Sequence, residues 1–199
     1  MRLASLAFAL SAVSANVSAQ LTVPLEIGDG GYLYVHVRVA DSIDVRLLLD
    51  TGAGINTLAP SILDRLGAQA HDAGTHTGTR HNGEQITGRL WSVPSVSLGS
   101  FIRRDVVVGR FAPDNADGML SMDYFRDVPF TLDLAAGTLT TEAPSKVRDI
   151  AAHAATIPIQ LKPNGPHELD FFVRVCAGDG VAARRQCGRH ASSSDSRKG

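Results

Sequence analysis

The stretch Leu47–Gly54 constrains the fold of this chain more than any other. Three consecutive leucines, Leu47–Leu49, follow the β-branched Val45 and predict a buried strand, and Asp50-Thr-Gly predicts that this strand ends in a tight turn. An aspartate is seldom buried without partners, because removing the ionised carboxylate from water is costly unless hydrogen bonds compensate. The Thr51 hydroxyl and the backbone N–H groups of the glycine turn are candidate partners. We therefore expect a carboxylate held in place at the end of a core strand.

These residues leave two interpretations of the turn open. In the first, Asp50 only accepts hydrogen bonds from its own backbone, as in an Asx-turn. In the second, the carboxylate serves a reaction, and the flanks favour this, because Ala53-Gly54 follows and Ile55–Leu58 leads out as a second short strand. With these flanks, the stretch resembles the active-site segment of aspartic peptidases of the pepsin and retropepsin type. The resemblance implies that Asp50, Thr51 and Gly52 form a catalytic turn.

A second stretch, Ala116–Phe125, resembles another segment of the same family. The family has Asp-Gly, two apolar residues and Gly here, in a segment that passes beside the catalytic loop and leads into a short helix. The resemblance implies that Gly118, Met119 and Leu120 belong to the substrate-binding site, although a plain apolar strand followed by a turn explains Met119 and Leu120 equally well. Ser121 stands where the family usually has Gly, at a position where backbone packs closely against backbone.

A polar hairpin is predicted between these two segments. Residues 71–88 are rich in Gly, Thr and His, and His81-Asn82-Gly83 is the expected tight turn. Such a hairpin buries little apolar surface, so we expect it to be mobile. It follows the active-site turn in the same order as the family's flap, and the resemblance implies that His81, Asn82 and Gly83 form the tip that closes over substrate.

Alternation predicts a half-buried strand at Tyr32–Val39, with Leu33 and three valines on one face and Tyr34, His36 and Arg38 on the polar face. His36 is therefore interpreted as a solvated surface residue. The other predicted elements are a short helix at 60–67, which has Pro in its first turn and Gly as its stop, and strands at 21–27, 45–50, 55–58, 89–93, 95–98, 101–108, 130–134 and 138–141.

The charge composition argues against a nucleic-acid-binding protein. The 19 Lys and Arg residues nearly balance the 20 Asp and Glu residues, and no basic stripe indicates a nucleic-acid partner.

A metal site is an alternative role for His71, His76 and His81, but on extended chain their five-residue intervals do not converge on one ion. We expect no metal and no other cofactor.

Residues 1–19 have the layout of a secretory signal peptide, with a basic residue before the apolar run Leu3–Val13 and small residues before a cleavage site near Ala19. The run is too short to span a bilayer comfortably. We expect export to the periplasm or the outside of the cell, with no membrane association after cleavage. An oxidising compartment would permit a disulfide between Cys176 and Cys187, and free thiols fit the sequence equally well.

An internal repeat indicates the start of a second lobe. Residues 22–27 and 156–161 match in residue type at every position, and each precedes an apolar strand. Aligning the two copies places Gln186 at the position of Asp50, so the second catalytic turn is missing and the second lobe is expected to be cut short. A shifted reading frame would explain this, and the nucleotide sequence around codons 176–188 tests that explanation. The predicted organisation is a signal peptide at 1–19, a peptidase lobe at 20–143, a helix or linker at 144–155, the start of a truncated second lobe at 156–181 and a disordered tail at 182–199.

The resemblance implies a mainly β fold, a pepsin/retropepsin-like closed β lobe with one or two short helices, and an aspartic endopeptidase of the exported bacterial type. In such a site two aspartates about 3 Å apart share one proton, so that one activates water while the other protonates the intermediate. One Asp-Thr-Gly turn supplies half of this dyad. Asp50 is thus expected to pair with a second Asp50 across a homodimer, with a peptide or protein as substrate. The alternative is an exported noncatalytic binding module, or an inactive truncated product of a two-lobe aspartic peptidase.

Overall fold

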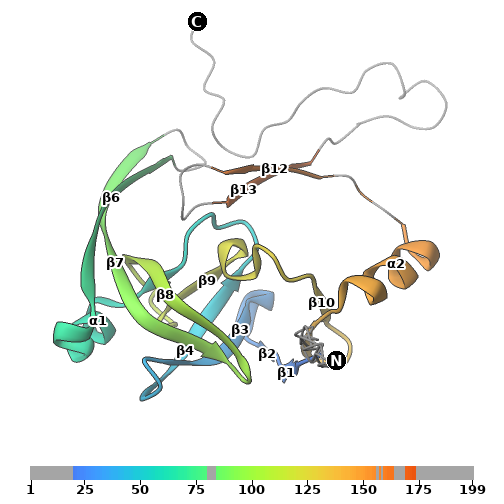
Figure 1. The fold of residues 1–199 in the computed structure, drawn as a ribbon, viewed down its shortest axis with the longest axis horizontal. Helices are drawn as coiled ribbons and strands as arrows, with labels where there is room; N and C mark the ends of the chain where they lie inside the picture. The colour runs from blue at the N-terminus through green and yellow to red at the C-terminus, as the bar shows by residue number, and fades with distance from the viewer. Residues whose placement is uncertain (1–19, 80–83, 156, 158, 164–168, 174–199) are drawn as a thin grey trace, which may run out of the picture.

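The computed structural model describes residues 20–79, 84–155, 157, 159–163 and 169–173. Strands dominate among them and two short α-helices accompany the strands, which confirms the predicted mainly β fold class (Figure 1). The helices are α1 (Pro60–Leu66) and α2 (Pro144–His153), and the 3₁₀ turns are η1 (Asp29–Gly31), η2 (Gly67–Gln69) and η3 (Met122–Phe125). The strands are β1 (Thr22–Pro24), β2 (Glu26–Ile27), β3 (Leu33–Val39), β4 (Ile43–Asp50), β5 (Thr57–Leu58), β6 (His71–Thr79), β7 (Gln85–Leu98), β8 (Phe101–Arg110), β9 (Gly118–Ser121), β10 (Phe130–Asp133), β11 (Thr138–Thr141), β12 (Ile159–Pro163) and β13 (Leu169–Val173).

A closed sheet forms the body of the lobe. Its strands follow the order β2-β3-β4-β9-β5-β8-β7-β6, and β3 also pairs with β7, which joins the two sides of the sheet into a barrel (Figure 1). The closing pairs are Arg38 with Ser97 and Val39 with Val96. The barrel encloses a single hydrophobic core, to which most of these strands and α1 contribute. Within this sheet β9 pairs with β4, the strand that ends at the Asp50 turn.

The alternation of β4 explains how the Asp50 turn leaves the core. Ile43, Val45, Leu47 and Leu49 are buried, whereas the residues between them lie on the other face. Leu48 is only half-buried, so the expectation that all three leucines lie in the core is wrong for that residue. Because side chains alternate along a strand, Asp50 shares the outer face with Leu48.

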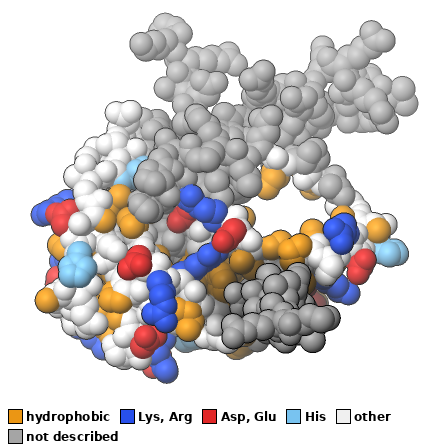
Figure 2. All heavy atoms as spheres, viewed as in Figure 1, with side chains coloured by type: hydrophobic (Ala, Val, Ile, Leu, Met, Phe, Trp, Pro, Cys, Tyr) orange, Lys and Arg blue, Asp and Glu red, His pale blue; other side chains and the backbone are white. Residues whose placement is uncertain are grey.

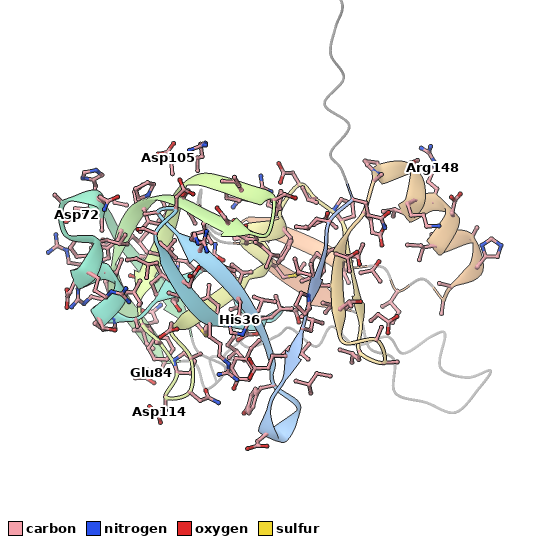
Figure 3. All side chains as sticks on the ribbon, turned by 90° about the horizontal axis from the view of Figure 1, so that it is seen from below. His36, Asp72, Glu84, Asp105, Asp114 and Arg148 are labelled. Atoms are coloured by element: carbon pink, nitrogen blue, oxygen red, sulfur yellow. The ribbon has the colours of Figure 1, made fainter. Side chains whose placement is uncertain are left out.

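Tyr34 also departs from its expected environment. It occupies the polar face of β3 together with His36 and Arg38, yet only 1% of it is exposed. The guanidinium of Arg46 on the neighbouring strand lies 3.5 Å from the centre of its ring and covers it. Cover by a residue of another strand cannot be seen in the alternation of β3 itself. His36 is exposed on the outside of the barrel, as expected (Figure 3).

The predicted strands 89–93 and 95–98 form one continuous strand, β7, although Pro94 interrupts them. The register passes from Val93 opposite Val106 to Ser95 opposite Arg104, so that Pro94 is left outside the ladder and exposed. Across from it, Asp105 has the left-handed φ of 50° and points outward (Figure 3). A proline lacks the N–H that a ladder needs, and this local irregularity accommodates it.

Helix α1 agrees with its prediction, because Pro60 lies at its first turn and its last turn ends at Gly67, whose φ is 53°. Ile62, Leu63 and Leu66 anchor it to the core. The predicted hairpin at 130–141 is β10–β11, and β1 extends it into a three-stranded sheet. The sequence fits either a helix or a linker at residues 144–155, and the structure has helix α2 there, with no buried residue.

A separate two-stranded antiparallel sheet, β12–β13, lies where the repeat predicts two strands. The division of the chain into a first lobe and the start of a second remains a prediction. The signal peptide, the flap tip at 81–83, both cysteines and the tail at 182–199 lie outside the described residues. Of the helices that are described, none is long and apolar enough to cross a membrane. Figure 2 shows acidic and basic side chains interspersed over the visible face of the barrel, in line with the balanced composition.

Candidate active site

The Asp50 turn holds its own carboxylate through the backbone. Asp50 Oδ1 accepts hydrogen bonds from the N–H groups of Gly52, at 2.8 Å, and Ala53, at 3.2 Å. These are the bonds of an Asx-turn, and they occupy one of the two carboxylate oxygens. Among the described residues, no group donates a hydrogen bond to Oδ2. The turn therefore has the hydrogen bonds of the first interpretation, and the second, in which the carboxylate serves a reaction, remains a prediction.

Thr51 and Gly52 lie on the exposed side of the turn. The glycine N–H is a partner of Asp50 as expected, whereas the second partner is Ala53 and not the Thr51 hydroxyl. A Cβ at position 52 would lie 3.3 Å from Asp50 Oδ1, which is tighter than an ordinary contact. Glycine therefore suits the close approach of backbone to carboxylate at this position.

Strand β9 lies directly beside the strand that carries Asp50. The two strands are parallel, and their register places Leu48 opposite Met119, Leu49 opposite Leu120 and Asp50 opposite Ser121. The structure thus brings the two segments of the family resemblance together. Leu120 is 1% exposed and belongs to the core, whereas Met119 is half-buried on the alternate face. Contact of Gly118, Met119 and Leu120 with substrate remains a prediction.

Gly118 has a structural reason to be glycine. Its φ is 151°, and a Cβ there would lie 2.1 Å from the carbonyl oxygen of Thr57 and 2.9 Å from the Cα of Leu58. No side chain fits at that distance. The absence of a Cβ lets β9 run against β5, which is the strand that leads out of the Asp50 turn.

Asn56 and Thr57 complete the site, although no motif in the sequence predicts a role for them. Asn56 Oδ1 accepts the N–H of Ser121 at 2.9 Å, and Thr57 Oγ1 accepts the N–H of Met119 at 3.0 Å. Both residues are about 95% buried, at 3% and 5% exposure. The available signal was two adjacent polar residues between Ile55 and Leu58 in an otherwise apolar strand. Their side chains therefore bind the segment that leaves the Asp50 turn to β9.

Ser121 fits at the position of the family glycine without backbone strain. It is completely buried, and its φ of −96° lies in the extended region that any residue adopts. Its hydroxyl donates to Asn56 Oδ1 at 3.2 Å and accepts the N–H of Asp123 at 3.2 Å, which caps η3. The segment leads into a short helix as the resemblance implies, and the serine contributes hydrogen bonds that glycine lacks.

A polar cluster on the outside of the barrel supports the same segment. The N–H of Arg46 donates to Asp117 Oδ2 at 2.9 Å, and the N–H of Asp117 donates to the Arg46 carbonyl at 2.8 Å. The Arg46 guanidinium also binds both oxygens of Glu26, at 2.6 and 2.9 Å. These bonds, assisted by His36, lower the pKa of Glu26 to about 2. Asp117, at the start of the second segment, is thereby fixed to β4.

The predicted flap corresponds to the hairpin β6–β7, whose strands pair from His71 opposite Ser92 to Thr79 opposite Gln85. The tip residues His81, Asn82 and Gly83 lie outside the described residues, so their contact with substrate remains a prediction. In the part of the chain that the structure describes, no group of three or more His, Cys, Asp or Glu side chains could hold a metal ion.

The chain is similar to a family model and to solved structures. The family model described as aspartyl protease matches residues 35–124. A solved structure similar to this chain is that of a retropepsin-like aspartic protease from Rickettsia conorii, with 17% identity, a TM-score of 0.46, and coverage of 61% of this chain and 90% of that one. A search of curated proteins gave no significant match. The region matched by the aspartyl protease model includes both the Asp-Thr-Gly turn and its neighbouring strand β9, so the two segments that the structure brings together lie within the part of the chain that is similar to that family.

Proposed function

We propose that this chain is an aspartic endopeptidase whose active site forms when Asp50 of one copy pairs with Asp50 of a second copy. The observation that carries the proposal is the state of the Asp50 carboxylate. Its Oδ1 is held by the N–H groups of Gly52 and Ala53, and within the described part of the chain its Oδ2 accepts no hydrogen bond. A carboxylate held on one side and open on the other is suited to bind and activate a water molecule.

The reaction needs a second carboxylate. One aspartate takes a proton from the attacking water, and the other gives a proton to the tetrahedral intermediate. Two aspartates can do both when they lie close enough to share one proton, because two like charges at that distance do not both ionise. The chain has one Asp-Thr-Gly turn. A two-fold dimer would supply the other aspartate from an identical turn.

The exposure of the turn supports this pairing. Thr51 and Gly52 are exposed at the tip of the turn, so they are accessible to the turn of a second copy. Asp50 itself lies on the outer face of β4 and not in the core. We infer that Thr51 and Gly52 hold the two turns together by hydrogen bonds.

A peptide or protein is the proposed substrate. The hairpin β6–β7 follows the Asp50 turn in the order expected of a flap, and its strand β6 is mostly exposed and polar. An extended substrate between this hairpin and the Asp50 turn would place a peptide bond at the carboxylate pair. We also propose that the protein acts after export, since residues 1–19 have the layout of a signal peptide.

Hydrolysis of a broad peptide library at acidic pH tests the proposal, with pepstatin as inhibitor and Asp50→Asn as the matched variant. Asparagine keeps the size of the side chain and an oxygen that can accept from Gly52 and Ala53, but it cannot act as a base. We expect pepstatin-sensitive cleavage by the wild-type protein and none by the variant. Equal cleavage by both proteins, or none by either, would contradict the proposal and leave the noncatalytic binding module.

Sedimentation of the mature chain tests the dimer separately. A protein that assembles its site from two copies must contain dimers at concentrations where it is active. A strict monomer with full pepstatin-sensitive activity would show that the second carboxylate comes from elsewhere.

A further inference from the structure

Ser121 lies on β9, and β9 contacts the chain both where it enters the Asp50 turn and where it leaves that turn. Strand β4 enters the turn and ends at Asp50, which lies opposite Ser121 in the parallel register of β4 and β9. The segment that leaves the turn begins at Asn56. Its Oδ1 accepts hydrogen bonds from the N–H of Ser121, at 2.9 Å, and from the hydroxyl of Ser121, at 3.2 Å. The residues between them form the turn. Its geometry therefore depends on how these two ends are held.

The orientation of the Asn56 amide is set by this contact. If the amide were reversed, its NH₂ group would face the N–H of Ser121, and two donors would oppose each other. In the observed orientation Asn56 Nδ2 is buried and has no hydrogen-bond partner in the described residues. Leaving a buried donor unpaired is unfavourable. Asn56 keeps this orientation despite the unpaired donor, because its oxygen accepts two hydrogen bonds from Ser121.

The hydroxyl of Ser121 extends the link to a rigid part of the fold. It accepts the N–H of Asp123, at the start of η3. The next residue, Tyr124, is buried, and its hydroxyl lies 3.1 Å from the Val96 carbonyl and 3.0 Å from the Phe101 carbonyl. The rings of Tyr124 and Phe125 also pack on Phe101. Ser121 thus links the segment that leaves the Asp50 turn to the aromatic cluster of Phe101, Tyr124 and Phe125.

We propose that Ser121 is a positioning residue for Asp50, and that its hydroxyl sets the geometry of the catalytic turn through Asn56. This inference rests on the proposed peptidase function and deepens it. A glycine at this position would keep the backbone bond to Asn56 but lose both hydroxyl bonds. In this chain the serine is accordingly part of the catalytic support, and replacing it with the family's glycine should impair the site.

The test uses Ser121→Ala and Ser121→Gly in the full chain, with Ser121→Cys as a second variant that fills the space but has only a weak donor. Ser97→Ala is the matched control, because Ser97 is also a buried serine but its hydroxyl has no partner in the described residues. Two readouts are needed. They are kcat and KM for pepstatin-sensitive cleavage, and the hydrogen-exchange rates of the Gly52 and Ala53 amides relative to amides of β8.

For Ser121→Ala and Ser121→Gly we expect kcat to fall on the order of tenfold to a hundredfold with little change in KM, because small displacements of a catalytic group have effects of this size. The Gly52 and Ala53 amides should exchange faster while the β8 amides keep their rates. Ser121→Cys should show the same changes to a smaller extent, and Ser97→Ala should show neither.

The two proposals fail in different ways. Unchanged kcat and unchanged exchange of Gly52 and Ala53 in the Ser121 variants would overturn the positioning role even if the wild-type protein is an active peptidase. A wild-type protein without pepstatin-sensitive activity would overturn the peptidase function. In that case faster exchange in Ser121→Ala would still support the role of Ser121 in holding the turn, and unchanged exchange would overturn it.

Discussion

Asp50 and Ser121 lie opposite each other in the parallel pairing of β4 with β9, although 70 residues separate them in the sequence. This relationship joins the two segments that resemble the aspartyl protease family. Asp50 contributes the carboxylate, and the segment around Ser121 supplies the strand against which the turn is built. The environment of the carboxylate is therefore set by long-range pairing as well as by its own turn.

Replacing Gly118 with alanine should severely destabilise the lobe. The added Cβ would lie 2.1 Å from the Thr57 carbonyl oxygen, so β9 and β5 would have to separate. We expect a loss of more than about 3 kcal/mol in the free energy of unfolding, measured by chemical denaturation. Gly88→Ala is the matched control, because a Cβ at Gly88 would have no atom within 4 Å and its φ is not left-handed. A change of more than about 1 kcal/mol in that control would contradict the steric explanation.

Glu26→Gln should reveal a pH-dependent contribution to stability. Hydrogen bonds from Arg46 lower the pKa of Glu26 from 4.5 to about 2 in the folded protein. A lowered pKa stabilises the fold above the unfolded value and loses this effect as pH falls through the folded value. The variant should therefore melt at a slightly lower temperature than wild type at pH 6, and the difference should shrink between pH 4.5 and pH 2. The same difference at every pH would show that the Glu26 charge is not its source.

Tyr124→Phe should cost about 1 kcal/mol of stability, the usual size for a lost neutral hydrogen bond. The Tyr124 hydroxyl lies within 3.1 Å of two backbone carbonyls, those of Val96 and Phe101, at the end of β7 and the start of β8. Burial also raises its pKa, so the hydroxyl stays protonated and remains a donor. The matched control is Tyr32→Phe, because Tyr32 is 56% exposed. Equal unfolding free energies for the two variants would contradict a role for the Tyr124 hydroxyl.

Local patterns in the sequence were sufficient to predict the elements around the site. Alternating apolar residues predicted β3, and proline and glycine marked the ends of α1. The resemblance carried by Asp50-Thr-Gly and by Ala116–Phe125 predicted which two segments would meet. Each of these features depends on residues close together in the chain, or on a motif long enough to be specific.

Features that depend on contacts between distant residues were not predicted. The burial of Tyr34 requires Arg46 from the neighbouring strand, so the polar face of β3 alone predicted exposure. The roles of Asn56 and Thr57 exist only because β9 offers its N–H groups to their side chains. Ser121 was identified as a departure from the family, but its partners Asn56 and Asp123 became visible only in the fold.

The most direct test of a shared carboxylate pair is activity in mixtures of wild-type protein and Asp50→Asn at a fixed wild-type concentration. If each site needs Asp50 from two copies, hybrid dimers are inactive. With equal amounts of the two proteins freely exchanging subunits, the pepstatin-sensitive activity per wild-type subunit should then fall to about half. Activity that stays constant as Asp50→Asn is added, under conditions where hybrid dimers are shown to form, would contradict the shared site.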